Sequence, residues 1–295
     1  MSQPLSALVA ASLDRSMIDC VRGIAATLGR ETGARAVLFY GSNLRTGALD
    51  GVLDFYVLLP GPRESGIWPR VGYREFDHGV RTLRAKIATM RIGTFQAAAA
   101  DETLDTTIWT RFVQPSAIAW AADDAARDEV TDAIAAAAVT ASRYAAALGP
   151  DSGDAAAYWR ALFRATYAAE FRVEASGREE QIIGVNRAHL DALLPAAWSA
   201  GGVAFADDGT SLRPRLSACD RTRVLARWRT RRRLGKPINV ARLIRAAFTF
   251  DGAARYAAWK IERHTGVHVP ITGWHERHPV LAAPGVLWRV WRAKR

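Results

Sequence analysis

"VLFYGSNLRTGALDGVLDFYVLLPG", residues 37–61, is the stretch from which both the fold and the chemistry are predicted. Its first apolar run ends at Gly41 and Ser42, which is typical of a short buried strand followed by a turn. A second apolar run, 53–59, carries Asp54 in its interior and is followed by a Pro-Gly pair. A carboxylate inside a strand is costly to bury without a partner, so Asp54 needs an explanation.

Phosphate binding would explain both features of this stretch. Gly41 allows backbone amides to approach a phosphate closely, and Ser42 adds a hydroxyl donor at the start of a predicted short helix. Asp54, on the adjacent predicted strand, would hold Mg²⁺ against the same phosphates, with its side chain pointing from the sheet into a cleft. The simpler interpretation is that the glycine only makes a turn and the aspartate lies at the edge of a strand.

The order of strand, Gly-Ser turn, short helix and acid-bearing strand resembles the nucleotidyltransferase superfamily. The common signature of that superfamily has a second acid two residues after the first, where this chain has Tyr56. A two-metal centre of the usual kind would therefore lack one ligand unless another aspartate supplies it. The candidates are Asp50, Asp77, Asp101 and Asp105.

Length and composition are those of a globular protein with one large domain or two modest ones. The chain has 295 residues, of which 49% are hydrophobic. Cys20 and Cys219 lie far apart without a CxxC or metal-ligand neighbour, so we expect neither a disulfide framework nor a zinc site. We read no signal peptide and no apolar run of about 18 residues, and therefore expect a cytoplasmic protein that does not span a bilayer.

Positive charge is concentrated in the last third of the chain. Residues 213–295 hold 20 Lys and Arg against 4 Asp and Glu, whereas residues 1–212 hold 20 against 25. A basic segment of this kind is typical of proteins that bind nucleic acid or an anionic membrane face. The alternative is that a high-GC genome favours arginine.

The pattern of apolar residues predicts an α+β protein in three parts. Residues 1–122 would form a nucleotidyltransferase-like mixed β-sheet with flanking helices, 123–270 an α-helical domain, and 271–295 a basic amphipathic tail. Strands are predicted within 34–42, 53–61 and 83–98, and a helix followed by a strand within 102–122. Helices are predicted at 5–30, 123–148, 155–176, 178–196, 218–234, 239–248 and 251–265.

Four segments together resemble one branch of the superfamily, the mitochondrial-type CTP:phosphatidate cytidylyltransferases of the translocator assembly and maintenance family. The first is FYGS followed by LDFYVLL, within 39–59, and in the family too no second acid follows. The others come in the family's order: LDTTIWTRFVQP at 104–115, FRATYAAEFR at 163–172 and a late helical pair at 239–266. The matching positions in the two middle segments are Asp105, Trp109, Arg111, Pro115, Tyr167, Glu170 and Arg172.

This resemblance implies an enzyme that makes CDP-diacylglycerol from CTP and phosphatidate and releases pyrophosphate. Mg²⁺ would be its cofactor, with Asp54 and Asp105 as metal ligands. These two residues and Lys86, on a predicted strand, would be the catalytic residues. Such an enzyme would be cytoplasmic and peripheral, on the inner face of the membrane.

The resemblance also assigns residues to the two substrates. The nucleotide would be bound by Tyr40, Gly41 and Ser42. The lipid phosphate would be bound by Arg111, Tyr167 and Arg172, since arginine matches phosphate geometry bidentately. For Lys86 and the two arginines the alternative is a surface charge or a structural ion pair.

Two basic segments near the C-terminus are candidates for contact with lipid. Residues 221–236 contain seven arginines and one lysine, which form either a solvated helix face or a surface for polyanions. No RNA-binding signature accompanies them, so no nucleic-acid partner is expected. The tail 284–295 has the composition of an interfacial anchor, although it could instead pack back onto the domain. The anchor residues would be Trp288, Arg289, Trp291 and Arg292.

Two rival functions stay open on the sequence alone. One is a nucleotidyltransferase with another acceptor, such as a different lipid phosphate, a small molecule or RNA. The other is a catalytically inactive scaffold that keeps the fold and binds membranes, for which Tyr56 in place of an acid is the motivation.

Overall fold

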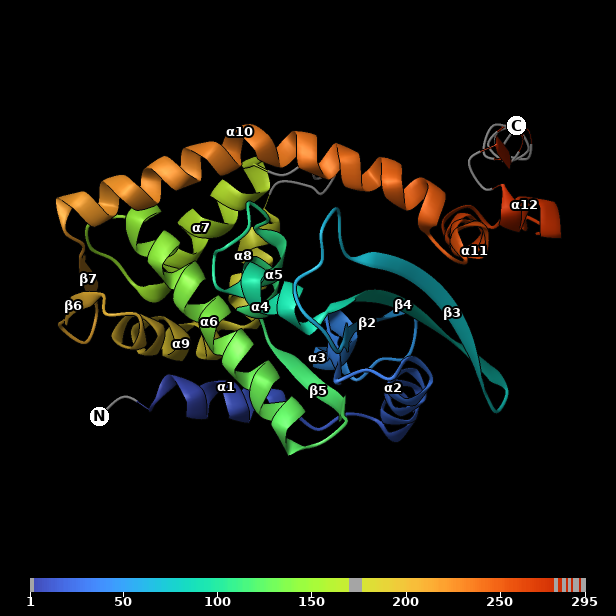
Figure 1. The fold of residues 1–295 in the computed structure, drawn as a ribbon, viewed down its shortest axis with the longest axis horizontal. Helices are drawn as coiled ribbons and strands as arrows, with labels where there is room; N and C mark the ends of the chain where they lie inside the picture. Colours follow the sequence, from blue (N-terminus) through green and yellow to red (C-terminus); the bar gives the residue numbers. More distant parts are fainter. Residues whose placement is uncertain are drawn as a thin grey trace.

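The computed structural model describes residues 3–169 and 177–278, and beyond these residues 281, 282, 285, 288 and 292. Its fold is α+β, with a five-stranded mixed sheet, flanking helices and a further helical region (Figure 1). The predicted fold class is therefore confirmed.

The sheet has the strand order β3-β4-β2-β1-β5. Its strands are β1 (Ala36–Tyr40), β2 (Val52–Leu59), β3 (Arg70–His78), β4 (Arg81–Arg91) and β5 (Ser116–Ala121). Strands β2 and β4 pair in parallel, whereas β1–β2, β1–β5 and β3–β4 are antiparallel pairs. Strand β2, which carries the internal aspartate, is thus the central strand, with a neighbour on each side.

The two faces of the sheet bury different side chains, because successive residues of a strand point to opposite faces. Leu53, Phe55 and Val57 of β2 pack in one cluster with the apolar side of α2 (Asp19–Thr32). Tyr56 and Leu58 belong to the larger cluster, to which the alanine-rich helix α6 (Asp124–Leu148) contributes. By the same alternation, Asp54 points to the face that carries the larger cluster.

The other helices connect the strands or form the helical region. They are α1 (Leu5–Leu13), α3 (Ser42–Thr46), α4 (Ile92–Ala99), α5 (Thr107–Phe112), α7 (Ala155–Ala169), α8 (Arg178–Val185), α9 (Arg187–Ala200), α10 (Ala218–Thr249), α11 (Ala253–Thr265) and α12 (Gly273–Arg277). A ribbon of β6 (Ala204–Asp207) and β7 (Leu212–Arg215) precedes α10. Figure 1 shows α10 along the upper edge of the molecule and α11 near the sheet at its end.

Side-chain caps fix the start of the two longest helices. Asp123 accepts a hydrogen bond from the Ala126 amide at the start of α6. Ser217 does the same for the Asp220 amide at the start of α10. Both residue types are favoured at this position because their oxygen satisfies an amide that has no partner within the helix.

Helix α10 is continuous over 32 residues, whereas the sequence predicts two helices, 218–234 and 239–248. The prediction ended the first helix because Gly235 and Pro237 are both poor helix formers. In the structure Gly235 lies against the backbone carbonyl of Ala169 in α7, where any side chain would collide. The glycine is therefore explained by a helix–helix crossing and does not end the helix.

Several other predicted boundaries are wrong. The helix predicted at 5–30 is two helices, α1 and α2, and the one at 178–196 is interrupted at Asn186. The segment 83–98 contains most of β4 followed by α4, where only strands were predicted. Strand β3 was missed because it is an edge strand whose sequence, RVGYREFDH, is mostly polar.

The boundary predicted at residue 122 does not separate two hydrophobic cores. The larger cluster contains Tyr40 and Tyr56 from the sheet together with Val130 of α6 and Trp159 of α7. The helical region thus continues the core that begins on one face of the sheet. No helix within the described ranges has both the length and the apolar character needed to cross a bilayer.

Candidate active site

A cavity of about 480 Å³ lies on the face of the sheet to which Asp54 points. Its volume is in the range of small-molecule binding sites. The residues that line it are Arg15, Tyr40, Gly41, Ser42, Leu44, Arg45, Asp54, Lys86, Thr110, Arg111, Gln114, Pro115, Tyr167, Gln181, Ile182, Val185 and Asn186. The structure therefore brings together Tyr40, Gly41, Ser42, Asp54, Lys86, Arg111 and Tyr167 from the set predicted from the sequence.

Strand register places three of these residues side by side. Asp54 on β2 is directly opposite Tyr40 on β1 and, on its other side, Lys86 on β4. Directly paired residues of neighbouring strands point to the same face, so the three side chains form one row across the sheet. Further along β2, the next residue on this face is Tyr56, which is buried in the core. Asp54 therefore lies where the core ends and the cavity begins.

The turn after β1 must be glycine at position 41. Gly41 has φ +90° and ψ −164°, a conformation that residues with a side chain rarely adopt. A Cβ atom there would also lie 3.2 Å from Oδ2 of Asp54. The turn and the acid thus face each other at close range, as the sequence predicts. Helix α3, which follows, is only 5 residues long.

Asn43 closes the loop between the turn and the acid. It is buried, and its side-chain amide donates hydrogen bonds to the carbonyls of Ala48 (2.8 Å) and Asp50 (3.2 Å). This side chain spans the loop that leads from α3 to β2. Its role is to hold that loop, which in turn fixes the start of the strand that carries Asp54.

The Asp54 carboxylate is partly buried without an ion pair. Burial raises the pKa of this carboxyl group above its ordinary value, and the positive charges of Lys86 and Arg111 oppose the shift. Within the described part of the chain, no side chain forms a hydrogen bond or a salt bridge with it. A cation that binds an unpaired, partly buried carboxylate of this kind stabilises its charged form.

Lys86 and Arg111 supply positive charge close to this carboxylate. Burial lowers the pKa of Lys86, the charge of Asp54 opposes this, and Arg111 and Lys260 lower it further. Arg111, on α5, donates a hydrogen bond of 2.9 Å to the Tyr40 hydroxyl, and its guanidinium lies 5.0 Å from the centre of the Tyr40 ring. With Arg15 and Arg45, the described residues place four cationic side chains along the cavity against one carboxylate. The arrangement favours a polyanionic ligand.

Asp105, predicted as a second metal ligand, does not line this cavity. It is buried and forms a salt bridge with Arg242 of α10, with N–O distances of 2.8 and 2.9 Å. It also accepts hydrogen bonds from the backbone amide and the hydroxyl of Thr107 at the start of α5. Burial alone would raise the pKa of Asp105, but Arg242 and Thr107 hold it below its ordinary value. The predicted role as metal ligand is replaced by a structural one.

The other acids proposed as replacements for the missing ligand are also outside the cavity lining, which contains neither Asp50, Asp77 nor Asp101. Asp101 instead pairs with Arg227 and Arg231 of α10. The position of the missing acid itself is occupied by Tyr56, whose ring packs against Phe95 and Phe112 in the core. A carboxylate there would be buried among aromatic rings.

The residues of the cavity fit a magnesium ion that is shared with phosphates, and do not fit an all-protein metal cage. No group of three or more His, Cys, Asp or Glu side chains capable of holding a metal occurs among the described residues. Mg²⁺ retains several waters and is commonly bound by one or two carboxylates plus substrate phosphates. Asp54, the unpaired carboxylate of this cavity, matches that requirement.

Part of the predicted set lies outside the described residues, namely Arg172, Arg289 and Trp291. Of the predicted membrane residues, Trp288 and Arg292 are described. The Trp288 side chain is 57% exposed, and the Arg292 guanidinium lies 5.1 Å from the centre of its ring. The Trp288 side chain therefore keeps most of its surface accessible.

Sequence reasoning missed several residues near this site. Arg15 and Arg45 line the cavity, and Gln181 and Asn186 add amide groups from the α8 segment. Arg15, Gln181 and Asn186 lie in no motif, because the loop before α2 and helix α8 meet the sheet only in the tertiary structure. Arg45 follows Ser42 by three residues, in the predicted short helix, but had no role assigned. Lys260, close enough to Lys86 to affect its pKa, was within the predicted late helical pair but had no role assigned.

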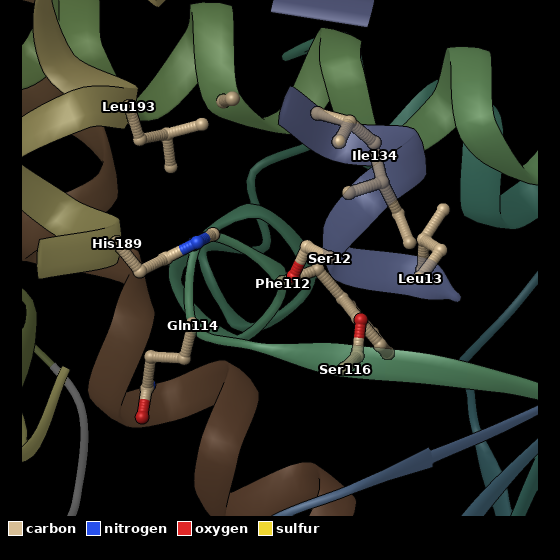
Figure 2. Close-up of a pocket in the computed structure, with 10 residues that line it drawn as sticks. Ser12, Leu13, Phe112, Gln114, Ser116, Ile134, His189 and Leu193 are labelled. Atoms are coloured by element: carbon tan, nitrogen blue, oxygen red, sulfur yellow. The ribbon is translucent and has the colours of Figure 1, made fainter. Parts of the chain in front are cut away.

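A second cavity, shown in Figure 2, lies beside the first and shares Gln114 with it. Its volume is about 10 Å³, which is room for one water molecule. His189 of α9 points into it, and its Nε2 lies 2.9 Å from the Val113 carbonyl. Burial lowers the pKa of this histidine, which favours the neutral ring. This cavity is too small for a substrate and belongs to the packing of α1, α6 and α9.

Comparison with protein-family models gave no match to this chain, and comparison with curated proteins gave none either.

Proposed function

We propose that the chain is a Mg²⁺-dependent cytidylyltransferase that converts phosphatidate to CDP-diacylglycerol. The observation that carries this proposal is that Asp54 faces the Gly41 turn and has Lys86 as its strand neighbour. An unpaired carboxylate faces a glycine turn within a cavity whose other charged residues, among those that the structure describes, are all cationic. A nucleoside triphosphate with its metal ion has the complementary charge pattern.

In the proposed reaction, a phosphate oxygen of phosphatidate attacks the α-phosphorus of CTP. A new P–O bond forms there, the bond from that phosphorus to the β-phosphate oxygen breaks, and pyrophosphate leaves with the electron pair. The attacking phosphate is already anionic near neutral pH, so no strong general base is needed. The protein would contribute in-line positioning and neutralisation of charge.

Each element of the cavity has a place in this proposal. Gly41 and Ser42 would lie against the phosphates of the nucleotide, and Lys86 would neutralise one of them. Asp54 would hold Mg²⁺, which supplies Lewis-acid polarisation of the phosphoryl oxygens when bound. Arg111 and Tyr167 would bind the lipid phosphate from the side of α5 and α7.

A stripe on the outer side of α10 supports a membrane surface as the partner. Arg229, Arg233, Lys236, Val240 and Ile244 follow one another at intervals of three or four residues and are exposed. Val240 is 44% and Ile244 57% exposed, so this end of the stripe offers aliphatic surface next to its cationic side chains. Cationic residues followed by exposed aliphatic ones suit the interface of an anionic bilayer.

A pyrophosphate-release assay tests the proposal directly. Purified protein is incubated with Mg²⁺ and each of the four nucleoside triphosphates, with and without phosphatidate vesicles. We expect release only with CTP and phosphatidate, and transfer of labelled CTP into lipid. Asp54→Asn should lower the rate at least about 100-fold, since it removes the charge that holds the metal. Asp77→Asn, at an exposed acid outside the cavity, is the matched control and should keep the rate.

Other outcomes of the same assay would identify the rivals. If pyrophosphate release needs a different lipid phosphate, a small hydroxylated molecule or RNA, that compound is the acceptor in place of phosphatidate. The reaction would still be nucleotidyl transfer. No release with any triphosphate, together with intact binding to vesicles, would contradict an enzyme and favour an inactive scaffold.

A further inference from the structure

Helix α11 is held against the edge strand of the sheet next to the candidate active site. The backbone amide of Tyr73 in β3 donates a hydrogen bond of 2.8 Å to the carbonyl of Asp251, just before α11. Gly252 follows with φ +75°, and a Cβ atom on it would collide with the Tyr73 carbonyl. The start of α11 is thus fixed on β3 by backbone contacts that allow no side chain at position 252.

A continuous row of contacts leads from Asp54 to α11. Lys86, the strand neighbour of Asp54, is itself directly opposite Tyr73 of β3. The Tyr73 ring lies 5.4 Å from that of Tyr256 on α11. One helical turn later, Nζ of Lys260 lies 5.9 Å from the centre of the Tyr256 ring. Tyr256 and Lys260 therefore lie on the same face of α11, and Tyr256 packs on Tyr73 at the end of the row that carries Asp54 and Lys86.

Electrostatic interactions agree with this geometry. Burial raises the pKa of Tyr256, and the charge of Asp54 raises it further, so its hydroxyl stays protonated and can donate a hydrogen bond. The charge of Lys260 is one of the causes that lower the pKa of Lys86. Like charges repel, and an anion bound by both lysines would relieve this repulsion.

Lys260 has no acidic partner within the part of the chain that the structure describes. Arg255, on the same helix, has an acidic partner, because it forms a salt bridge of 2.8 Å with Glu276 of α12. Helix α11 thus carries one basic residue that holds the next helix and another that is exposed beside the site. The second is available to bind a ligand.

We propose that Lys260 is a phosphate-binding residue of the candidate active site and that α11 forms its second wall. The cavity wall made by α5, α7 and α8 would take the acceptor, and Lys86 and Lys260 together would hold the polyphosphate end of the nucleotide. The inference rests on the proposed function for the class of ligand, a nucleoside triphosphate, and adds a residue and a helix to its site.

Inorganic tripolyphosphate is the probe that tests Lys260 apart from catalysis, because it contains neither a base nor a lipid. Its affinity is measured by calorimetry on the full chain at fixed ionic strength. We expect Lys260→Ala to weaken binding about tenfold, which is the loss of one charge-assisted contact. Lys260→Arg should restore most of the affinity. Arg255→Ala, which removes the same charge from the other side of α11, should change it less than about twofold.

Each result decides the assignment. Equal affinity of the wild type and Lys260→Ala would overturn it, as would equal losses for Lys260→Ala and Arg255→Ala, which would indicate a general effect of charge. Absence of tripolyphosphate binding to the wild type would overturn it too. If the selective loss is found and CTP with phosphatidate still gives no pyrophosphate, the phosphate site stands and only the proposed reaction fails.

Discussion

At the scale of single residues, Asp54 lies at a position where its negative charge does not help the fold and is explained by ligand binding. The carboxylate lies in the central strand, one step on the same face from the buried Tyr56. Its pKa is raised because burial disfavours the charged form more than Lys86 and Arg111 favour it. The folded chain therefore holds the Asp54 proton more tightly than the unfolded chain does, and ionisation of this group costs stability.

We predict that Asp54→Asn raises the thermal unfolding midpoint at pH 7.5 in the presence of a chelator. The loss of stability caused by ionisation of Asp54 begins as pH rises through the ordinary aspartate pKa. It is complete above the raised pKa that Asp54 has in the folded chain. The difference between variant and wild type should therefore narrow as pH falls toward about 4, the ordinary aspartate pKa. Differential scanning calorimetry over this pH range measures it.

Asp77→Asn serves as the control, because this acid is exposed on β3 and outside the cavity lining. It should leave the midpoint unchanged at every pH. A lower midpoint for Asp54→Asn at pH 7.5 would mean that Asp54 stabilises the fold, and its interpretation as a ligand-binding residue would lose its physical basis.

At the scale of elements, α10 holds the segment that positions Arg111. Arg231 and Arg242 form salt bridges with Asp101 and Asp105, at the two ends of the loop between α4 and α5. Asp105 also accepts the hydrogen bond from the Thr107 amide at the start of α5. Since α5 carries Arg111 into the cavity, the ion pairs to α10 fix the place of a site residue from a distance.

We predict that Arg242→Ala destabilises the chain by about 3–5 kcal/mol, because it leaves the buried Asp105 carboxylate unpaired. The double variant Asp105→Ala/Arg242→Ala should cost clearly less than the two single changes added together. Urea unfolding of the four proteins provides the cycle. As a control, the exposed pair Arg187 and Asp191 on α9 should show a coupling below about 1 kcal/mol. Additive effects at Asp105 and Arg242 would contradict a buried ion pair.

At the scale of the whole molecule, charge is distributed so that one long helix carries much of the positive excess. Figure 1 places α10 along an edge of the molecule, and the stripe from Arg229 to Ile244 lies opposite its buried residues Val224, Trp228 and Arg231. Helix α2, on the other face of the sheet, is also basic in part, with exposed Arg22 and Arg30. It offers a comparison for any effect of charge alone.

The prediction at this scale is that Arg233→Ala/Lys236→Ala weakens binding to vesicles with anionic lipid by roughly 30-fold, at about 1 kcal/mol for each charge. Sedimentation with vesicles of graded phosphatidate content measures the partition coefficient. Arg22→Ala/Arg30→Ala removes the same total charge and should have a much smaller effect. Equal losses for the two pairs would show that net charge, and not the α10 stripe, governs the association.

Much of the site could be predicted because its main features are local in the sequence. The apolar runs predict β1 and β2, and the glycine between them predicts the turn. Asp54 is the one acid within the second apolar run, which marks it as a candidate site residue. Asp105 shows the limit of such reasoning. Its residue type and its neighbours suit a metal ligand, and only the approach of Arg242, more than a hundred residues later, makes it structural.

The sequence by itself determined the α+β class, helix α6 and the strand pair that brings Gly41 and Asp54 together, since each depends on periodicity or on contacts between neighbouring segments. Tertiary structure alone decided that α10 is one helix, that Arg15 reaches the cavity, and that Lys260 lies close enough to Lys86 to affect its pKa. The reason is physical. Hydrophobic periodicity records which face of an element is buried, but it does not record which distant element covers that face.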